Sequence, residues 1–281
     1  MYNIIDGKEV SAYIKQQVKL QTDSLKQQGI EPCLAVIIVE GDPASRVYVN
    51  NKKKACDACG IKSLEFSLAG DVKEDELLSL IEKLNNDGSV HGILCQLPLP
   101  KHIDEKKVIG TISPEKDVDG FSAVNVGKIW LGDYDFSPCT PMGVMELLDY
   151  YKIDLEGKNC VIVGRSNIVG KPMAALLLER NATVTLCHSK TKDIASFMKN
   201  ADVIIAAVGK ANFVTADMIK TGAVVVDVGI NRNAQGKLCG DVDFDNVKDK
   251  ASYITPVPGG CGPMTIAVLM KNTLVAAKKV K

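Results

Sequence analysis

Apolar and polar residues alternate along the first half of the chain with two different periods, and each period predicts one type of element. Apolar residues recur at helical spacing over 7–28, 44–59 and 73–86, which predicts amphipathic helices. Short, mostly apolar runs predict strands at 33–39, 62–67 and 90–96. Strands that alternate with helices in this way are typical of a mainly parallel sheet.

The second half of the chain repeats this alternation with more strongly apolar strands. Four apolar runs separated by helix-length spacers predict strands at NCVIVG (159–164), TVTLC (183–187), DVIIAAVG (202–209) and AVVVDVG (223–229). Strands that are apolar on both faces are typical of a doubly wound sheet, because helices cover each side of it. Two further helices are predicted at 140–151 and 263–281.

The turn-rich stretch that ends near residue 137 divides the chain. We therefore predict a two-domain α/β protein, with an N-terminal catalytic domain over 1–137 and a Rossmann-type domain over 138–262. The last helix, 263–281, is predicted to complete the first domain. No run of about 18 uncharged apolar residues and no targeting leader is seen, so we expect a cytoplasmic protein without a membrane partner.

Charge and cysteine content narrow the class of protein. The 281 residues include 34 Lys+Arg and 34 Asp+Glu, which lacks the basic excess of a nucleic-acid-binding surface. Nine cysteines scattered among apolar runs indicate a reducing compartment. Cys56 and Cys59 form a C-x-x-C without a second pair or a histidine at ligand spacing, so we predict no metal site. Core packing is the main interpretation of this pair, and a thioredoxin-like redox site is the alternative.

The stretch VIVGRSNIVGKP, residues 161–172, is close to two kinds of phosphate-binding loop. A P-loop requires Ser or Thr after its lysine as a magnesium ligand, but Pro172 follows Lys171. A dinucleotide fingerprint, G-x-G-x-x-G, keeps its outer glycines as Gly164 and Gly170, while Ser166 replaces the middle one. Because a predicted strand turns into a helix here, the pattern favours a dinucleotide site.

The end of the next predicted strand distinguishes NAD from NADP. NAD sites typically place a carboxylate there to accept the ribose 2′-hydroxyl, whereas none of residues 188–191 is acidic. Arg165 offers a guanidinium to a phosphate, and Ser189 offers a hydroxyl. We therefore predict NADP as the cofactor. The alternative is that Arg165 and His188 are solvated loop residues.

One lysine of the helix predicted over 44–59 lies on its apolar face. A run of lysines is usually a solvated face, and the helical period does turn Lys53 and Lys54 toward water. Lys52 instead falls one turn from Tyr48, in line with small residues of the next turns. Apolar surroundings favour a neutral amine, which suits acid-base chemistry. The alternative is a lysine whose stem follows the rim of the apolar face while its ammonium reaches water.

Five motifs, in order from about residue 6 to the C-terminus, resemble those of the bifunctional methylenetetrahydrofolate dehydrogenase/methenyltetrahydrofolate cyclohydrolase family. They are Ser45-x-x-Tyr48-x-x-x-Lys52, QLPLP (96–100), PEKDVDG (114–120), Gly164-Arg165-Ser166 with Val169-Gly170, and PGGCGPMT (258–265). The resemblance implies two α/β domains with a cleft between them, a homodimer formed through the nucleotide-binding domain, and NADP as oxidant.

The resemblance also implies the chemistry. The family oxidises 5,10-methylenetetrahydrofolate to the methenyl cation and then hydrates that cation to 10-formyltetrahydrofolate, in one-carbon metabolism. Two other functions stay open: a dehydrogenase relative with a single activity, and a nucleotide-binding regulatory module without turnover. A phosphotransferase is disfavoured by Pro172.

The matched motifs assign the candidate site residues. The catalytic set is Lys52, Tyr48, Gln96 and Asp119. Leu97, Pro258, Gly259 and Gly260 join these four in binding the substrate. The cofactor-binding set is Gly164, Arg165, Ser166, Gly170, His188, Ser189, Ile230 and Thr265.

The folate-side roles each have a plainer alternative. Lys52 is expected to manage protons in the hydration step with Gln96 as its hydrogen-bond partner, although a strand-end glutamine commonly points to solvent. Tyr48 offers a ring face to the p-aminobenzoyl group, or it is a core tyrosine. Asp119 is expected to accept two N–H groups of the pterin. Asp117 is the competing choice, which would instead cap the local turn.

The remaining expectations concern the cofactor side and departures from the family pattern. Ile230 is expected beside the nicotinamide, and Thr265 is expected to open the last helix. The loop before Ser45 lacks an asparagine common in relatives, so we expect a reshaped pocket entrance. Cys95 and Cys261 replace other small residues, and we expect neither to touch a proposed acid, base or charge partner.

Overall fold

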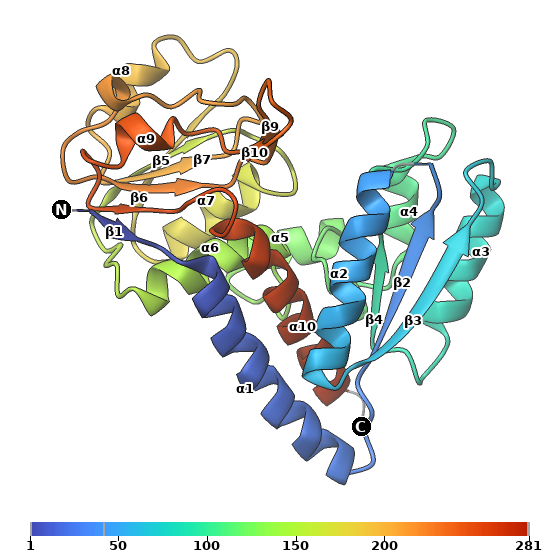
Figure 1. Cartoon of the computed structure of the whole chain (residues 1–281). Helices are drawn as coiled ribbons and strands as arrows, with labels where there is room; N and C mark the ends of the chain where they lie inside the picture. The colour runs from blue at the N-terminus through green and yellow to red at the C-terminus, as the bar shows by residue number, and fades with distance from the viewer. Residues whose placement is uncertain (1, 42, 280–281) are drawn as a thin grey trace. The chain divides into compact units, whose positions relative to one another are not determined.

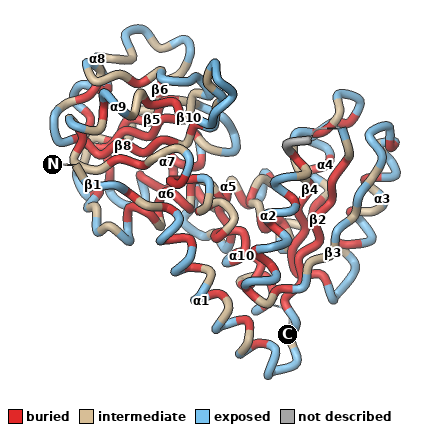
Figure 2. Tube along the Cα trace, viewed as in Figure 1, coloured by how far each residue is buried: buried red, intermediate tan, exposed pale blue. Residues whose placement is uncertain are grey.

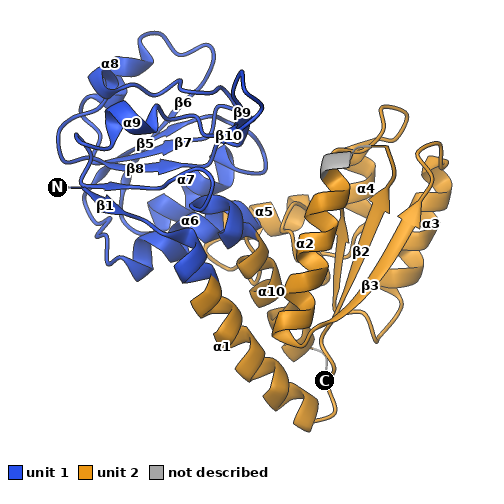
Figure 3. Ribbon diagram, in the orientation of Figure 1, with its two compact units in different colours: residues 1–11, 138–265 blue, residues 12–137, 266–281 orange. Residues whose placement is uncertain are grey.

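The computed structural model describes residues 2–41 and 43–279, without the side chains of residues 43 and 44. The chain forms two compact units (Figure 3). Unit 1 comprises residues 1–11 and 138–265, and unit 2 comprises residues 12–137 and 266–281. Two long helices, α1 (Gly7–Gln27) and α10 (Cys261–Lys279), contribute residues to both units.

Unit 2 is built on a three-stranded parallel sheet in the order β3-β2-β4 (Figure 1). Its strands are β2 (Cys33–Val39), β3 (Lys62–Leu68) and β4 (Gly92–Cys95). Its own helices are α2 (Pro43–Cys59), α3 (Glu74–Asn85), α4 (Glu105–Thr111) and α5 (Ala123–Leu131). All seven residues of β2 are buried, as expected for a central strand covered on both faces.

The two faces of β2 receive different helices. The alternate residues Cys33, Ala35, Ile37 and Val39 pack in one core with apolar residues of α3 and α4. Helix α2 contacts β2 and β3 directly. The sheet therefore fixes α2 beside the carboxyl end of β4, where the motif QLPLP begins.

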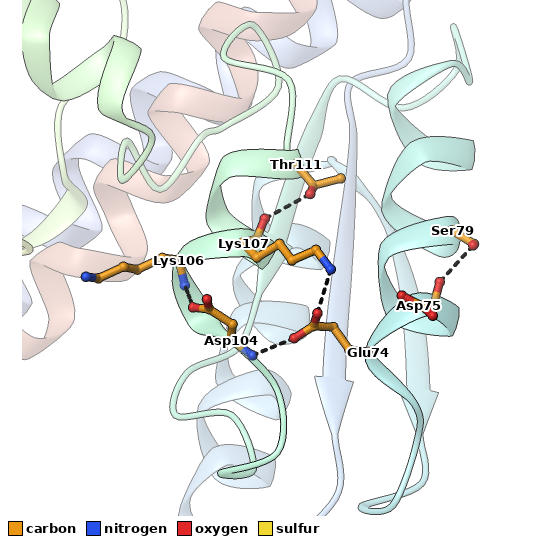
Figure 4. Close-up of polar contacts among 7 residues, drawn as sticks. All are labelled: Glu74, Asp75, Ser79, Asp104, Lys106, Lys107 and Thr111. Carbon is orange, nitrogen blue, oxygen red and sulfur yellow. Dashed lines mark hydrogen bonds and ion pairs between the residues drawn. The ribbon is translucent and has the colours of Figure 1, made fainter.

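Polar contacts tie the start of α3 to the start of α4 (Figure 4). The Glu74 carboxylate accepts the backbone N–H of Asp104 at 2.8 Å and the Lys107 ammonium at 2.7 Å. These contacts, led by the backbone N–H, hold the pKa of Glu74 below its usual value. Asp104 in turn caps α4 by accepting the N–H of Lys106 at 2.9 Å.

Unit 1 contains a six-stranded parallel sheet in the order β1-β11-β8-β7-β5-β6. The strands are β1 (Asn3–Ile4), β5 (Asn159–Val163), β6 (Thr183–Cys187), β7 (Val203–Ala206), β8 (Val224–Asp227) and β11 (Tyr253–Ile254). Its helices are α6 (Cys139–Tyr150), α7 (Gly170–Glu179), α8 (Ile194–Met198) and α9 (Phe244–Val247), with the short 3-10 helix η1 (Ala216–Met218). A separate antiparallel hairpin pairs β9 (Asn231–Arg232) with β10 (Leu238–Cys239).

The strand order places a topological switch point in this sheet. The chain leaves β5 toward β6 on one side and returns to β7 on the other side of β5. In open parallel sheets of this kind, ligands bind beyond the carboxyl ends of the strands at the switch point. Figure 2 shows β5, β7 and β8 as buried traces, which is what a sheet covered on both faces requires.

The prediction of a two-domain α/β fold with a parallel Rossmann-type sheet is confirmed. The predicted strands at 33–39 and 183–187 have the observed bounds, and the other predicted elements differ at their ends by a few residues. The sequence missed β1, β11, α4, α5 and the β9–β10 hairpin. These are short elements, and two-residue strands carry no detectable periodicity.

The grouping of the first residues differs from the predicted domain 1–137. Residues 1–11 belong to unit 1, because Asn3 and Ile4 pair in parallel with Tyr253 and Ile254. The predicted roles of the two domains stay predictions at this point. Among the described residues, no helix combines the length and the apolar character needed to cross a membrane.

His91 couples the stability of unit 2 to pH. Its side chain is buried, and its Nδ1 accepts the backbone N–H of Cys33 at 3.1 Å. Burial, with a smaller contribution from Lys116, lowers the pKa of His91 below its ordinary 6.5. The unfolded chain therefore binds a proton that the folded chain does not, and stability falls as the pH drops below about 6.5.

We predict that His91→Asn, which keeps an acceptor near the Nδ1 position, removes part of this pH dependence. In the wild type the free energy of unfolding should fall by up to about 1.4 kcal/mol per pH unit just below pH 6.5. Urea denaturation of both proteins between pH 5 and 7.5 measures the slope. Identical slopes would contradict the assignment to His91.

Candidate functional site

The candidate lysine lies on the buried face of α2. Lys52 is only 8% exposed, whereas Lys53 and Lys54 are exposed. Ser45 and Cys56 are buried on the same face. The predicted inward orientation of Lys52 is thus observed, and its alternative, an ammonium in open water, does not fit this burial.

The first turn of α2 is anchored to the sheet by Arg46. The Arg46 guanidinium forms ion pairs with Glu40 and Glu65 and donates to Ser67 Oγ at 2.9 Å. These partners lie on β3 and just after β2. Such fork-like contacts fix direction as well as distance, so they orient the helix that carries Lys52.

Lys52 and Gln96 form a direct hydrogen bond. The Lys52 Nζ donates to Gln96 Oε1 at 2.9 Å, and Gln96 Nε2 donates to the carbonyl oxygen of Leu97 at 2.6 Å. The second bond identifies the NH₂ end of the amide, so the oxygen faces the lysine. Gln96, which follows β4, is partly buried rather than turned into solvent. The hydrogen bond thus gives the amine a neutral acceptor in Gln96.

The two aspartates of the PEKDVDG motif have different surroundings. Asp117 is 2% exposed, and its carboxylate accepts from the N–H groups of Gly120 (3.1 Å), Phe121 (3.3 Å) and Ser122 (2.8 Å) and from Asn125 Nδ2 (2.9 Å). A carboxylate with this many protein donors is committed to holding its own turn.

Asp119 is partly exposed and lines a small cavity with Cys95 and Leu97. The backbone between the two aspartates is also held by Asn272 of α10, which donates to the carbonyl oxygen of Val118 at 2.9 Å. Both aspartates line this cavity, and Asp119 is the more exposed of the two, whereas Asp117 is held by its own turn.

Tyr48 lies one turn before Lys52 on α2 but is 42% exposed. The alternative of a core tyrosine is therefore wrong, and its ring is accessible. The loop before Ser45, predicted to reshape the pocket entrance, includes Asp42, which lies outside the described residues.

Buried cysteines of unit 2 pack in its core. Cys56 and Cys59 are fully buried, and burial raises their pKa values to about 12 and about 11. This is opposite to the low pKa of a reactive C-x-x-C thiol, so the redox alternative does not fit. Cys95 lines the small cavity together with Asp119, and the expectation that it touches no proposed acid, base or charge partner stays a prediction. Burial raises the pKa of Cys95 to about 12.

In unit 1, a cavity of about 420 Å³ lies at the switch point of the sheet. Its lining comes from the loops that follow β5, β6 and β7: Gly164, Arg165, Ser166, His188, Ser189, Ala207, Val208 and Lys210 are among its residues. This is the position at which doubly wound sheets bind dinucleotides. The cavity brings together five of the eight predicted cofactor residues.

The loop after β5 has the backbone of a dinucleotide turn. Gly164 has φ +128°, and a Cβ there would stand 2.0 Å from the carbonyl oxygen of Ala207. Ser166, in place of the middle glycine, accepts the N–H groups of Val169 at 3.1 Å and Gly170 at 3.4 Å through its Oγ. It therefore satisfies two N–H groups at the start of α7, where Gly170 is the first residue.

The P-loop interpretation receives no support from the same loop. The Lys171 ammonium, which would reach the phosphates in a P-loop, donates to Asn167 Oδ1 at 2.7 Å. Pro172 is buried in α7. A nucleoside triphosphate site would need both positions free for ligands.

The turn after β6 is ordered by its own contacts and contains no acid. The backbone N–H of His188 donates to Thr191 Oγ1 at 2.9 Å, and His188 Nδ1 accepts the N–H of Lys190 at 3.1 Å. Ser189 and Arg165 are exposed at the rim of the cavity. These residues fit a 2′-phosphate better than a bare ribose hydroxyl.

The other predicted residues of unit 1 lie outside the lining of that cavity. Gly259 and Gly260 are buried and Pro258 is exposed, in the loop between β11 and α10. Thr265 does not open the last helix, because α10 already begins at Cys261. Its Oγ1 lies 2.9 Å from Thr140 Oγ1. Ile230, after β8, is 52% exposed.

Two buried carboxylates of unit 1 were missed by the sequence analysis. Asp227 and Asp241 are 2% and 0% exposed and accept backbone N–H groups of the loops around the cavity. In the sequence, Asp227 lies in the run VVVDVG and Asp241 lies in the run CGDVD. Each run resembles an ordinary strand end, so neither aspartate was recognised as a buried hydrogen-bond acceptor. Among the described residues, no group of His, Cys, Asp and Glu has the arrangement of a metal site.

Comparison with known proteins covers almost the entire chain. The family model "Tetrahydrofolate dehydrogenase/cyclohydrolase, catalytic domain" matches residues 5–119. The model for the NAD(P)-binding domain of the same family matches residues 138–281. The chain is 62% identical over 279 residues to the bifunctional protein FolD of Agathobacter rectalis, with coverage of 99% of this chain and 100% of the relative.

Solved structures of similar proteins give the same picture. The bifunctional enzyme FolD of Campylobacter jejuni superimposes with a TM-score of 0.97 at 55% identity, over 99% of each chain. The methylenetetrahydrofolate dehydrogenase-cyclohydrolase of Trypanosoma brucei, solved with NADP and an inhibitor, superimposes with a TM-score of 0.95 at 38% identity. That match covers 99% of this chain and 98% of the other.

The different surroundings of Asp117 and Asp119 predict different costs of removal. Asp117→Ala leaves four donors without their acceptor and should destabilise unit 2 by about 3–5 kcal/mol. Asp119→Ala should change stability by less than about 1 kcal/mol. Urea denaturation of the two variants measures both effects. Equal losses of stability would show that Asp117 is not the residue that holds this turn.

Proposed function

The chain belongs to the tetrahydrofolate dehydrogenase/cyclohydrolase family, and from this premise we propose which residues carry its two reactions. The chain is a bifunctional enzyme of one-carbon metabolism. It oxidises 5,10-methylenetetrahydrofolate to 5,10-methenyltetrahydrofolate, with NADP accepting the hydride, and hydrolyses the methenyl product to 10-formyltetrahydrofolate. The residue roles below are our proposal, carried above all by the hydrogen bond between Lys52 and Gln96.

Lys52 manages the protons of the hydrolysis. The methenyl substrate is a cation, so a neutral amine beside it avoids a repulsion that an ammonium would impose. Water attacks the methenyl carbon, Lys52 takes the proton, and the C–N5 bond then breaks as a proton is delivered to N5. One proton is released overall. Gln96 supports this role because its oxygen accepts from the amine without adding a negative charge that would favour the ammonium.

The remaining folate contacts follow from exposure and chemistry. Tyr48 offers an accessible ring for stacking on the p-aminobenzoyl group. Asp119 accepts the adjacent N–H donors of the pterin, a role supported by the commitment of Asp117 to its own turn. Leu97 and the loop Pro258, Gly259 and Gly260 are proposed to contact the flat substrate through backbone and apolar surface.

The NADP site is proposed at the switch-point cavity. Gly164 lets the backbone turn closely there, and the N-terminus of α7, which begins at Gly170 and is preceded by the hydrogen-bonded turn of Ser166, faces the pyrophosphate. Arg165, His188 and Ser189 bind the 2′-phosphate. Ile230 and Thr265 are proposed to contact the nicotinamide end.

We extend the proposal to organisation and location. The N-terminal domain with the C-terminal helix binds folate, and the Rossmann-type domain binds NADP. A homodimer forms through the NADP-binding domain, as the family resemblance implies. The reducing compartment indicated by nine cysteines favours the cytoplasm, and all nine are free thiols in the structure.

The proposal for Lys52 predicts that its substitution impairs hydrolysis of the methenyl substrate without weakening NADP binding. Lys52→Met keeps a side chain of similar length but cannot accept a proton, so hydrolysis of methenyltetrahydrofolate should fall by about 100-fold or more. NADP affinity should stay within about twofold, because Lys52 is not among the residues that line the proposed NADP cavity. Loss of methenyl absorbance measures hydrolysis, and calorimetry measures NADP binding.

Lys53→Met provides the matched control for this experiment. It removes an exposed lysine from the same helix and should leave both measurements unchanged. Equal hydrolysis rates in Lys52→Met and Lys53→Met would remove Lys52 from the mechanism.

The proposal for the 2′-phosphate predicts a shift in cofactor choice. Ser189→Asp places a carboxylate at the end of β6, where it repels a 2′-phosphate and accepts a 2′-hydroxyl. The ratio of kcat/KM for NADP to that for NAD should fall by about 10- to 100-fold. Ser189→Asn, of similar size but uncharged, should change it much less. A ratio unchanged by Ser189→Asp would place the 2′-phosphate elsewhere.

A further inference from the structure

Two buried carboxylates that the proposed mechanism does not use lie beside the NADP cavity. Asp227 ends β8, and Asp241 follows β10; they are 2% and 0% exposed. Burying two carboxylates near each other is unfavourable unless both are well hydrogen-bonded. Their donors therefore identify what the pair holds in place.

Asp241 accepts four hydrogen bonds from two different loops. Its Oδ2 accepts the N–H groups of Val208 at 2.5 Å and Gly209 at 3.0 Å. Its Oδ1 accepts the N–H of Lys210 at 2.9 Å and the Nδ2 of Asn231 at 2.8 Å. Three consecutive backbone N–H groups after β7 thus point at a single carboxylate.

Asp227 likewise accepts backbone N–H groups, from the segments that follow β8 and β10. Its Oδ1 accepts the N–H groups of Gly229 and Asp241, both at 2.9 Å, and its Oδ2 accepts the N–H of Val242 at 2.8 Å. The two carboxylates are packed against glycines: a Cβ on Gly229 would stand 2.3 Å from Asp241 Cγ, and one on Gly240 would stand 1.8 Å from Asp227 Oδ2. No side chain fits at either position.

One of the segments held by this pair lines the cofactor cavity, and the other carries Ile230. Val208 and Lys210 line the cavity directly. Ile230, 52% exposed, stands between Gly229, which is held by Asp227, and Asn231, which is held by Asp241. An apolar side chain kept exposed on a backbone fixed from both sides suits contact with a flat ligand ring.

We propose that Asp227 and Asp241 are positioning residues of the NADP site: they fix the loop 207–210 in the cavity wall, and they fix the backbone on both sides of Ile230, which is proposed to contact the nicotinamide end. This rests on the proposed NADP site and adds residues that touch neither cofactor nor substrate. The carboxylates act as fixed acceptors for seven N–H donors, four on Asp241 and three on Asp227.

Burial makes ionisation of Asp227 unfavourable. Burial, opposed by the three backbone N–H groups and assisted by the Asp241 charge, raises the pKa of Asp227 to about 6. The fold thus retains a carboxylate where ionisation is unfavourable, and such local costs are typical of places where geometry serves a site.

Asp241→Asn tests the proposal because an amide offers one acceptor atom where the carboxylate offers two. The NH₂ group then faces backbone N–H donors, and the loop 207–210 must move. Isothermal titration calorimetry with NADP should show a Kd raised by about 10- to 100-fold. Hydrolysis of methenyltetrahydrofolate, assayed without nucleotide, should stay within about twofold of wild type. Asp243→Asn, two residues away with its carboxylate on Asn246, is the control and should change neither value.

The outcomes separate positioning from general stability. An unchanged Kd for NADP would overturn the proposal. A parallel loss of hydrolysis and NADP binding, with a lower Tm, would also overturn it in favour of a purely structural role. Assays of both activities on the wild-type enzyme test the proposed function. The comparison of Kd values for NADP requires no turnover, so it tests the positioning role separately.

Asn231→Ala keeps the proposal testable if Asp241→Asn does not fold. It removes the hydrogen bond from Asn231 to Asp241, so the backbone is released on one side of Ile230 and stays held by Asp227 on the other. The Kd for NADP should rise several-fold, while that for 2′,5′-ADP, which lacks the nicotinamide end, should stay unchanged. Equal changes for both ligands, or none for either, would contradict a role for Asn231 and Asp241 at Ile230.

Discussion

The burial of one amine beside a neutral acceptor is the constraint on which the folate side of the molecule depends. Lys52 is buried on α2 and donates a hydrogen bond to Gln96, and Gln96 presents its oxygen because its NH₂ group is bound to the next carbonyl. Both residues are placed by the same sheet, through α2 on one side and the end of β4 on the other. A carboxylate in place of Gln96 would stabilise the ammonium and oppose a cationic substrate.

The dinucleotide side solves a different problem, since it must hold several loops in a fixed shape around a large ligand. Backbone N–H groups after β7 and β8 are directed at Asp227 and Asp241. Charged acceptors make stronger hydrogen bonds than neutral ones. Buried carboxylates accept backbone N–H groups in both units, whereas the buried Lys52 of unit 2 donates to a neutral amide.

Much of this could be read from the sequence, for identifiable reasons. The helical period alone turned Lys52 inward, because adjacent lysines fall on different faces. The absence of an acid after β6 is a local property and pointed to NADP directly. Asp117 and Asp119 could not be separated by sequence spacing, since the distinction depends on donors that arrive from Gly120, Ser122 and Asn125 in the folded turn. Asp241 was missed because its donors come from residues 208–210 and 231, which only the tertiary fold brings to it.

The division of the chain between the units has a consequence for biosynthesis. The backbone passes from one unit to the other at 11/12, 137/138 and 265/266, so neither unit is a continuous segment. On the ribosome, the strand at residues 3–4 emerges about 250 residues before its partner at 253–254. The pairing at this edge of the sheet forms only after residues 253–254 have been synthesised. Pairing so distant in sequence slows folding. In a nascent chain that stalls before β11, residues 3–4 therefore have no partner strand. We expect such a chain to be a substrate for chaperones.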